Sequence, residues 1–133
     1  MADILHIDDD PDMRALVRCI LKEHRVTGVA SAPEALARLA RGTPDLLLVD
    51  LDLSYTGNPD GGRALARLAV GRGLPTLIVS GCPNAPRFAC ELGAPYLIKP
   101  FAASDLRRAV ALALAAGRVA GGNRASAHER AVR

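Results

Sequence analysis

Residues 44–53 read PDLLLVDLDL, and this stretch decides the fold class. Its centre, residues 46–49, is apolar at every position, which is typical of a strand buried on both faces of a sheet. Asp50 then ends the run abruptly. Four further strands are expected, over residues 4–7, 26–30, 76–79 and 96–98, and the second of these is a weak candidate.

Segments with apolar residues at helical spacing separate these strands. The expected helices cover residues 11–24, 33–41, 63–70, 82–92 and 104–116. Pro11 and Pro33 stand where a first helical turn begins, a position that proline tolerates. The order of strand and helix, repeated five times, predicts an α/β fold with a five-stranded parallel sheet that is doubly wound, with helices on both faces.

The chain of 133 residues has the length of one domain, and its charge is unevenly distributed. Residues 1–116 hold 13 Lys+Arg and 13 Asp+Glu, whereas residues 117–133 carry a net charge of +3 and show no hydrophobic period. We therefore expect a domain over residues 1–116 and a flexible basic tail over residues 117–133. A neutral domain with 3% aromatic residues argues against nucleic-acid binding.

Cysteine content and hydropathy bear on the compartment. The three cysteines are odd in number and lack paired spacing, which argues against a secreted disulfide framework. Acidic residues interrupt the first ten positions, and no apolar run reaches the length of a membrane span. We expect a cytoplasmic protein without membrane contact.

Polar side chains follow the strands at the points where the apolar runs stop. The carboxyl ends of parallel strands meet at one edge of a sheet, where ligands bind in such folds. The residues expected to gather there are Asp8, Asp9, Asp10, Asp50, Asp52, Ser80, Gly81 and Lys99.

These residue types point to phosphoryl chemistry with a metal ion. Two carboxylates about 4 Å apart repel each other by roughly 4 kcal/mol at an effective dielectric of 20, so a cluster of them favours a bound cation. A site that offers oxygen atoms and neither His nor Cys suits Mg²⁺. Lys99 and Ser80 add a cation and a hydroxyl donor for an anion, so the group predicts phosphoryl transfer to a carboxylate.

Taken singly, several of these residues have simpler interpretations. Asp10 is best read as the cap of the helix that follows it. His6 lies inside a strand and is expected to be a core or interface histidine whose hydrogen bonds are satisfied. Ser80 alone would be a loop hydroxyl and Lys99 alone a solvated charge. The arrangement of acids, hydroxyl and lysine at successive strand ends is what favours a site.

The sequence resembles the receiver domain of two-component response regulators, particularly the single-domain chemotaxis type. The resemblance covers residues 3–116 and rests on four segments: ILHIDDDPDMR (4–14), PDLLLVDLDL (44–53), PTLIVSG (75–81) and YLIKPF (96–101). It implies a flavodoxin-like receiver fold with the strand order 2-1-3-4-5.

The resemblance also implies a role for each matching position. Asp50 would accept the phosphoryl group, with Mg²⁺ held by Asp8, Asp9, Asp50 and the backbone carbonyl of Asp52. Ser80, Gly81 and Lys99 would contact the phosphoryl group, and Tyr96 would change rotamer on activation. The Lys99–Pro100 peptide bond would be cis, which an X–Pro bond tolerates.

Two segments depart from the family's pattern. The loop over residues 51–61 is about three residues longer than usual. The stretch from Ser80 to Lys99 is about three residues shorter and carries Pro83 and Pro86, so we expect a short fourth helix interrupted by proline. The usual signalling face would be reshaped, and the loop over residues 54–62 would present a surface in its place.

Two alternative functions stay open at this point. Residues 50–54, DLDLS, imitate the nucleophile motif of haloacid-dehalogenase-type phosphatases. That family needs acidic metal ligands after the lysine, and only Asp105 and Glu129 follow Lys99. The other alternative is a receiver-like binding module that works without phosphorylation, against which the complete set of site residues argues.

The expected function is therefore that of a phosphoacceptor. A histidine kinase or a histidine phosphotransfer protein would supply the phosphoryl group. The chain would not be an enzyme beyond self-catalysed phosphotransfer and slow autodephosphorylation. Residues 117–133 are too few for an effector domain, so output is expected through contact with an unknown downstream protein, or the chain is part of a longer one.

Overall fold

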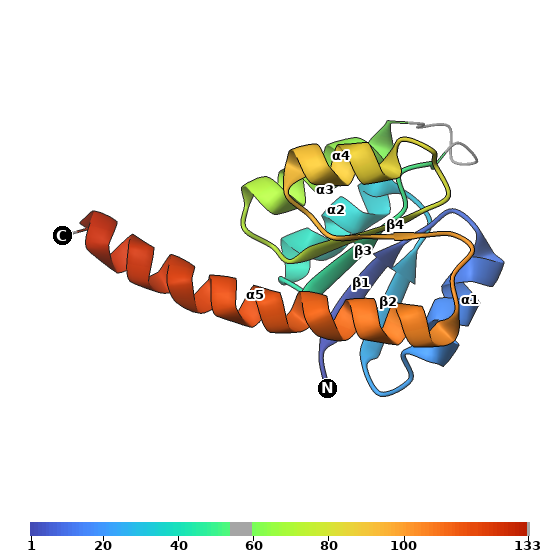
Figure 1. Ribbon diagram of the computed structural model, residues 1–133, viewed down its shortest axis with the longest axis horizontal. Coiled ribbons are helices and arrows are strands. Elements are labelled where there is room, and N and C mark those ends of the chain that lie inside the picture. Colours follow the sequence, from blue (N-terminus) through green and yellow to red (C-terminus); the bar gives the residue numbers. More distant parts are fainter. Residues whose placement is uncertain (54–59, 133) are drawn as a thin grey trace.

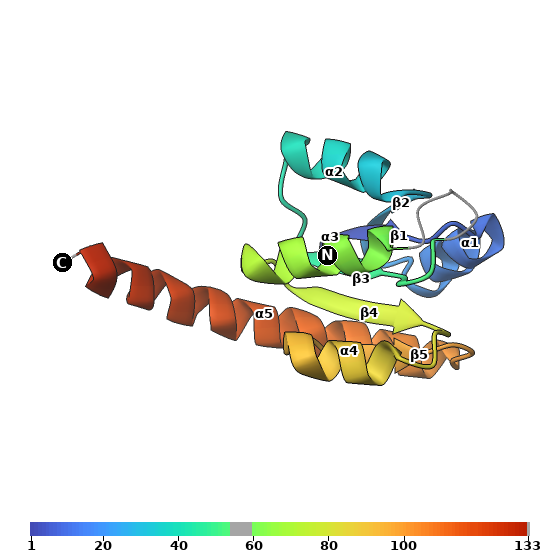
Figure 2. The same cartoon turned by 90° about the horizontal axis from the view of Figure 1, so that it is seen from above.

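Five strands form a single parallel sheet in a computed structural model of the chain. The strands are β1 (Asp3–Ile7), β2 (Arg25–Val29), β3 (Leu46–Val49), β4 (Thr76–Ser80) and β5 (Tyr96–Ile98). They pair in the order β2-β1-β3-β4-β5, which confirms the expected order, and Figure 2 shows this succession from above. The structure describes the backbone of residues 1–53 and 60–132, and side chains within these ranges up to residue 117.

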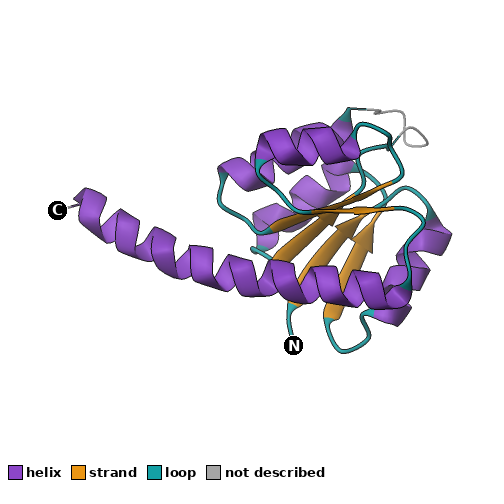
Figure 3. Ribbon diagram, in the orientation of Figure 1, coloured by secondary structure: helices purple, strands orange, loops and turns teal. Residues whose placement is uncertain are grey.

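The helices cover the two faces of the sheet unequally. They are α1 (Pro11–Ile20), α2 (Ala32–Arg41), α3 (Gly61–Gly71), α4 (Ala85–Leu92) and α5 (Ala103–Val132). Figures 1 and 3 show α1 and α5 on one face and α2, α3 and α4 on the other. The predicted doubly wound α/β fold is therefore confirmed. None of these helices combines the length and apolar character needed to cross a bilayer.

The sheet separates two apolar cores, because successive side chains of a strand point to opposite faces. Leu5 and Ile7 of β1 face α2, α3 and α4, where Phe88 is a prominent partner. Ile4 faces α1 and α5, where it packs with residues such as Leu106. β3 is buried at all four positions, as its unbroken apolar sequence predicts. Helices on both faces thus hold the strand ends in place.

Two glycines allow close contacts that fix helices on this framework. A Cβ atom at Gly62 would lie 2.1 Å from the backbone carbonyl oxygen of Asp50, so the start of α3 packs directly on the end of β3. A Cβ atom at Gly117 would lie 2.5 Å from Cγ of Pro75, just before β4. Any larger residue at either position would force the helix away from its contact.

The helix boundaries differ from expectation at three places. α1 ends at Ile20 instead of residue 24. Leu21 still donates its N–H to the Val17 carbonyl, and the chain then turns more tightly, with the N–H of His24 donating to the Leu21 carbonyl. α4 is short, as expected, but proline does not interrupt it. Pro83 precedes the helix and Pro86 lies in its first turn, where no amide donor is needed.

The third difference concerns the last helix. α5 continues to Val132, so the helix end expected near residue 116 is wrong. Alanine and arginine favour a helix, and each glycine costs only about 1 kcal/mol, so the glycines weaken the segment without breaking it. The division of the chain at residue 116 and the mobility of residues 117–133 stay predictions. The long loop expected over residues 54–62 lies mostly outside the described residues.

Candidate functional site

The expected strand-end residues line one cleft at the carboxyl edge of the sheet. Its volume is about 490 Å³. Its lining residues come from the ends of β1, β3 and β4, from the start of α3 and from the segment after β5: Asp8, Asp9, Asp10, Asp50, Asp52, Asp60, Arg63, Gly81, Cys82, Pro83 and Lys99. Seven of the eight expected residues therefore share this cleft, and Ser80 lies buried directly before Gly81.

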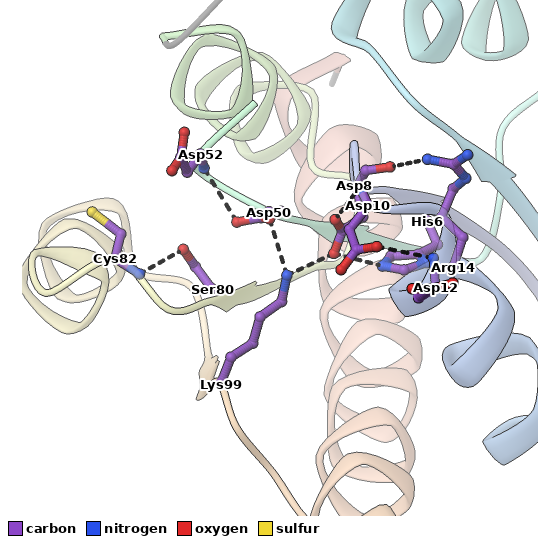
Figure 4. A network of polar contacts seen from close by, with 10 residues as sticks. All are labelled: His6, Asp8, Asp10, Asp12, Arg14, Asp50, Asp52, Ser80, Cys82 and Lys99. Carbon is purple, nitrogen blue, oxygen red and sulfur yellow. Dashed lines mark hydrogen bonds and ion pairs between the residues drawn. The ribbon is translucent and has the colours of Figure 1, made fainter. Parts of the chain in front are cut away.

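Lys99 joins two buried carboxylates at the centre of the cleft. Its Nζ donates to Oδ2 of Asp8 at 2.7 Å and to Oδ2 of Asp50 at 3.0 Å (Figure 4). The side chains of Asp8 and Asp50 are almost fully buried, at 1% and 8% exposed. Hydrogen bonds between charged partners are short and strong, and they gain further in a buried environment. The ammonium group thus offsets much of the repulsion between the two acids.

Burial and charge act in opposite directions on these groups. Burial raises the pKa of Asp50 above its usual value, and the nearby charge of Asp8 raises it further, while Lys99 pulls it down. For Lys99, burial alone would lower the pKa. The hydrogen bond to Asp8 and the charges of Asp50 and Asp8 outweigh burial and raise it. Lys99 therefore stays charged at neutral pH.

The start of α1 holds Asp8 in position. Asp8 Oδ1 accepts the backbone N–H of Asp10 at 3.0 Å. Asp10 Oδ1 accepts the N–H of Asp12 at 2.9 Å, so Asp10 is the helix cap that its sequence position predicts. Nη1 of Arg14 donates to the Asp8 backbone carbonyl at 2.7 Å. The Arg14 side chain crosses Gly28 of β2, where a Cβ atom would lie 3.2 Å from Cδ of Arg14.

The turn after β3 shapes the other side of the cleft. The backbone N–H of Asp52 donates to Oδ1 of Asp50 at 3.1 Å, which leaves the Asp50 carboxylate held from both sides, by this amide and by Lys99. Gly62 packs against the Asp50 backbone from α3. The expected use of the Asp52 backbone carbonyl as a metal ligand stays a prediction.

Ser80, Gly81 and Tyr96 are the remaining expected residues. The Ser80 hydroxyl accepts the backbone N–H of Cys82 at 3.1 Å and points away from Lys99 (Figure 4). A Cβ atom at Gly81 would make only an ordinary contact with Lys99, at 3.7 Å. Tyr96 begins β5, is 47% exposed and does not line the cleft. Its role as a switch stays a prediction. The Lys99–Pro100 peptide bond is cis, as the resemblance implies.

The carboxylates are arranged in a way that fits a divalent cation. One oxygen atom each of Asp8, Asp9 and Asp50 can be chosen so that all three lie within 4.8 Å of one another. A donor set made only of carboxylate oxygens suits Mg²⁺, which binds proteins through few carboxylates and keeps several waters. The residues present therefore fit the metal that the resemblance implies.

The sequence pattern missed two arginines that shape the cleft. Arg14 supports the Asp8 backbone. Arg63 lines the cleft, donates to Sγ of Cys82 at 3.2 Å and lies over the ring of Phe88. Both arginines lie on helices, where an isolated arginine looks like a solvated surface charge. The sequence offered only indirect signs of these arginines, namely Gly28, which makes room for Arg14, and Gly62, which lets the start of α3 lie on β3.

One sequence expectation about this region is wrong. His6 is buried, as expected of a core histidine, but its hydrogen bonds are not satisfied. Among the described residues, neither ring nitrogen has a hydrogen-bond partner. Burial, with the positive charges of Lys99 and Arg14, lowers the pKa of His6 to about 3. The ring is therefore neutral at physiological pH.

Fold and site together define a doubly wound α/β domain with an acidic, lysine-bridged cleft at the carboxyl edge of its sheet. The family model described as the response regulator receiver domain matches residues 4–111. The chain therefore belongs to the receiver domain family of response regulators.

Individual relatives agree with this assignment. The regulatory protein VirG of Agrobacterium fabrum is 35% identical over 117 residues, which cover 84% of this chain and 45% of VirG. The crystal structure of the NtrX receiver domain from Brucella abortus is 33% identical, with a TM-score of 0.73, and the match covers 84% of this chain and 98% of that one. The sensor histidine kinase TmoS of Ectopseudomonas mendocina is 27% identical over 80% of this chain and 11% of TmoS. The chain thus spans less than half the length of VirG and a small part of TmoS.

Proposed function

We propose that this chain accepts a phosphoryl group on Asp50, with Mg²⁺ held by Asp8, Asp9 and Asp50. The observation that supports this most directly is the position of Lys99, which bridges Asp8 and Asp50 at 2.7 and 3.0 Å. A buried carboxylate with a fixed cation beside it can act as a nucleophile toward phosphorus and can keep the negatively charged product in place.

The chemistry is the transfer of a phosphoryl group to a carboxylate oxygen. An oxygen of Asp50 attacks the phosphorus of the donor, a new O–P bond forms, and the bond between phosphorus and the donor's leaving atom breaks with its electron pair going to that atom. Asp50 must be ionised to attack, and Lys99 favours that ionised form against the effect of burial. Mg²⁺, when bound, would neutralise charge on the phosphoryl oxygens.

The protein groups around Asp50 have distinct tasks in this proposal. Lys99 exchanges its carboxylate partners for a phosphoryl oxygen. The Ser80 hydroxyl gives up the amide of Cys82 and donates to another phosphoryl oxygen. Such local exchanges of hydrogen bonds are the usual way in which phosphorylation reaches the rest of a domain.

The partners follow from the family. We propose a histidine kinase or a histidine phosphotransfer protein as donor and a downstream protein as target, both in the cytoplasm. The match to part of TmoS, a sensor histidine kinase, supports the link to such systems. The chain would catalyse its own phosphorylation and slow dephosphorylation, and would turn over no other substrate.

A direct test is phosphorylation by a small donor. Acetyl phosphate with Mg²⁺ should add the mass of one phosphoryl group to the intact chain, and Asp50→Ala should abolish this gain. Asp105→Asn is the matched control, since Asp105 is an exposed acid in the first turn of α5 that does not line the cleft; it should still be phosphorylated. A mass gain that persists in Asp50→Ala would refute the assignment.

An assay of phosphate-monoester hydrolysis, run beside this measurement, separates the two alternatives. A haloacid-dehalogenase-type phosphatase would hydrolyse a phosphate monoester with turnover, whereas a phosphoacceptor would stop after one group. Asp105, one of the two acids after Lys99, is exposed in the first turn of α5 and does not line the cleft. A module that works without phosphorylation would gain no mass at all.

A further inference from the structure

His6 is a buried polar side chain to which the proposed chemistry gives no task. Its exposed fraction is 1%, and its ring nitrogens have no hydrogen-bond partner among the described residues. Burial of an unpaired donor or acceptor destabilises a fold, and such groups in a native domain require an explanation. The other positions of β1 after Asp3 are apolar, so the strand would be better packed with an aliphatic residue here.

The ring faces the acidic cleft. His6 and Asp8 are two positions apart on β1 and its extension, so their side chains emerge on the same face of the sheet. Nε2 of His6 lies 3.8 Å from Oδ2 of Asp8, beyond hydrogen-bond distance but within about 1 Å of it (Figure 4). That oxygen already accepts the short bond from Lys99.

The surroundings allow this gap to close by movement of side chains alone. Arg14 and the pairing of Asp8 with Val29 hold the Asp8 backbone, and the Asp10 amide holds Oδ1 of its carboxylate. Oδ2 can therefore move toward His6 by a small rotation about that bond, without moving the strand. When Lys99 turns toward a phosphoryl group, Oδ2 of Asp8 loses its donor. Nε2 of His6, 3.8 Å from that oxygen, is then a buried donor within reach of it.

We propose that His6 is a positioning residue for Asp8, whose Nε2–H donates to Asp8 Oδ2 whenever Lys99 leaves that oxygen. The bond would keep the carboxylate aimed at the metal site through phosphorylation. Carboxylates that bind metals are commonly held by such outer hydrogen bonds, and their loss lowers metal affinity about 10- to 100-fold. The inference rests on the proposed function, because that function requires Lys99 to move.

A double-mutant cycle on the full unphosphorylated chain tests this role. Lys99→Met frees Oδ2 permanently, and Mg²⁺ affinity is then measured by calorimetry with and without His6→Leu. We expect His6→Leu to weaken Mg²⁺ binding about tenfold in the Lys99→Met background, and less than threefold when Lys99 is present. His6→Gln keeps an N–H donor and should restore affinity to within about threefold of the His6 parent.

Stability measurements exclude a purely structural effect. Ile4→Val is the matched control, because Ile4 lies on the same strand and face without reaching the cleft. It should lower the urea midpoint of the metal-free chain and leave Mg²⁺ affinity unchanged. His6→Leu removes an unpaired polar group and should not lower the midpoint.

Three outcomes would overturn the role of His6. These are equal Mg²⁺ affinities with and without His6→Leu in the Lys99→Met background, equal losses in both backgrounds, and a His6→Gln variant as weak as His6→Leu. Failure of the proposed function would be seen separately, as a wild-type chain that takes up no phosphoryl group. A wild-type chain that binds no Mg²⁺ would overturn both.

Discussion

The ionised carboxylate of Asp50 is favoured by Lys99 and disfavoured by burial and by Asp8. Without a metal ion, the ionised group lowers the stability of the fold at neutral pH. Burial and Asp8 favour the neutral carboxyl group, while Lys99 favours the carboxylate, and the net result is a raised pKa. A carboxyl group with a raised pKa in the folded state binds its proton more tightly there than in the unfolded chain. The free energy of unfolding therefore falls as the pH rises above 3.8 and through the folded pKa.

We therefore predict that Asp50→Asn stabilises the metal-free domain at neutral pH. The amide carries no charge to desolvate, and Lys99 keeps Asp8 as partner. Urea denaturation in EDTA at pH 7 should give a higher midpoint for Asp50→Asn than for the wild type, and the difference should shrink as the pH approaches 4. A lower midpoint at pH 7 would show that the bond from Lys99 to Asp50 outweighs burial.

His6 should make the domain sensitive to acid. Its folded pKa of about 3 lies below the ordinary value of 6.5, so between these values only the unfolded chain takes up the proton. Stability present above pH 6.5 is lost as the pH falls toward 3. At pH 5 the loss amounts to about 2 kcal/mol.

The measurement is the difference in unfolding free energy between the wild type and His6→Leu. This difference should shift in favour of His6→Leu by about 2 kcal/mol from pH 7.5 to pH 5 in metal-free buffer. A difference independent of pH would mean that the buried ring is protonated in the folded state as readily as in the unfolded one.

The acidic residues after β1 should divide into metal ligands and a helix cap. Asp8→Asn and Asp9→Asn each remove a ligand charge and should weaken Mg²⁺ binding at least tenfold, about the loss of 1.4 kcal/mol. Asp10→Asn is the control, because asparagine caps a helix as well as aspartate does. It should change Mg²⁺ affinity by less than about threefold in calorimetry. Equal losses of Mg²⁺ affinity in Asp9→Asn and Asp10→Asn would show that the metal ligands are assigned one residue too early.

At the scale of elements, the contact of α3 with β3 joins a helix to the strand that leads into Asp50. Gly62 lets the first turn of α3 lie on the backbone of Asp50 and Leu51. The two segments that the structure describes on either side of residues 54–59 are therefore in direct contact with each other. The position of Asp50 depends on this contact as well as on strand pairing.

Gly62→Ala should destabilise the domain by about 2–3 kcal/mol, because its Cβ would collide with backbone atoms that cannot turn aside. Gly71→Ala is the matched control in the same helix, since nothing lies within 4 Å of a Cβ atom there. It should be neutral or stabilising by up to about 1 kcal/mol. Urea denaturation of both variants decides the matter, and a Gly62→Ala variant as stable as Gly71→Ala would contradict the close contact.

For the whole molecule, the sequence was sufficient to predict the architecture and the set of strand-end residues. Each apolar run of β1, β3 and β4 stops at a polar residue, and parallel pairing then brings these residues to one edge without further information. The roles of Arg14 and His6 were harder to predict from the sequence. Arg14 can reach Asp8 because Gly28, on a neighbouring strand, leaves room for its side chain. The role of His6 depends on how closely its Nε2 approaches Oδ2 of Asp8, which is about 1 Å beyond hydrogen-bond distance, and a sequence pattern does not contain that distance.

The helix ends show a different limit. Local propensity is a weak guide, since a glycine in a helix costs about as much as a single hydrogen bond contributes. Small differences in free energy therefore decide where these helices begin and end. Examples are the continuation of α5 beyond Gly117 and the position of Pro86 in the first turn of α4. The family's longer-range pattern, by contrast, set the strand order and the cis bond before Pro100 correctly.

The contact between Gly117 and Pro75 has a mechanical consequence. It lies near the middle of α5, with roughly 22 Å of helix on either side at 1.5 Å per residue, and one arm begins just after Lys99–Pro100 (Figure 1). The half of α5 before this contact also packs on the sheet through Leu106, Val110 and Ala113, so the helix can tilt about Gly117 only together with that packing. Such a tilt would move its two ends in opposite directions, and a tilt of about 10° would carry each end about 4 Å.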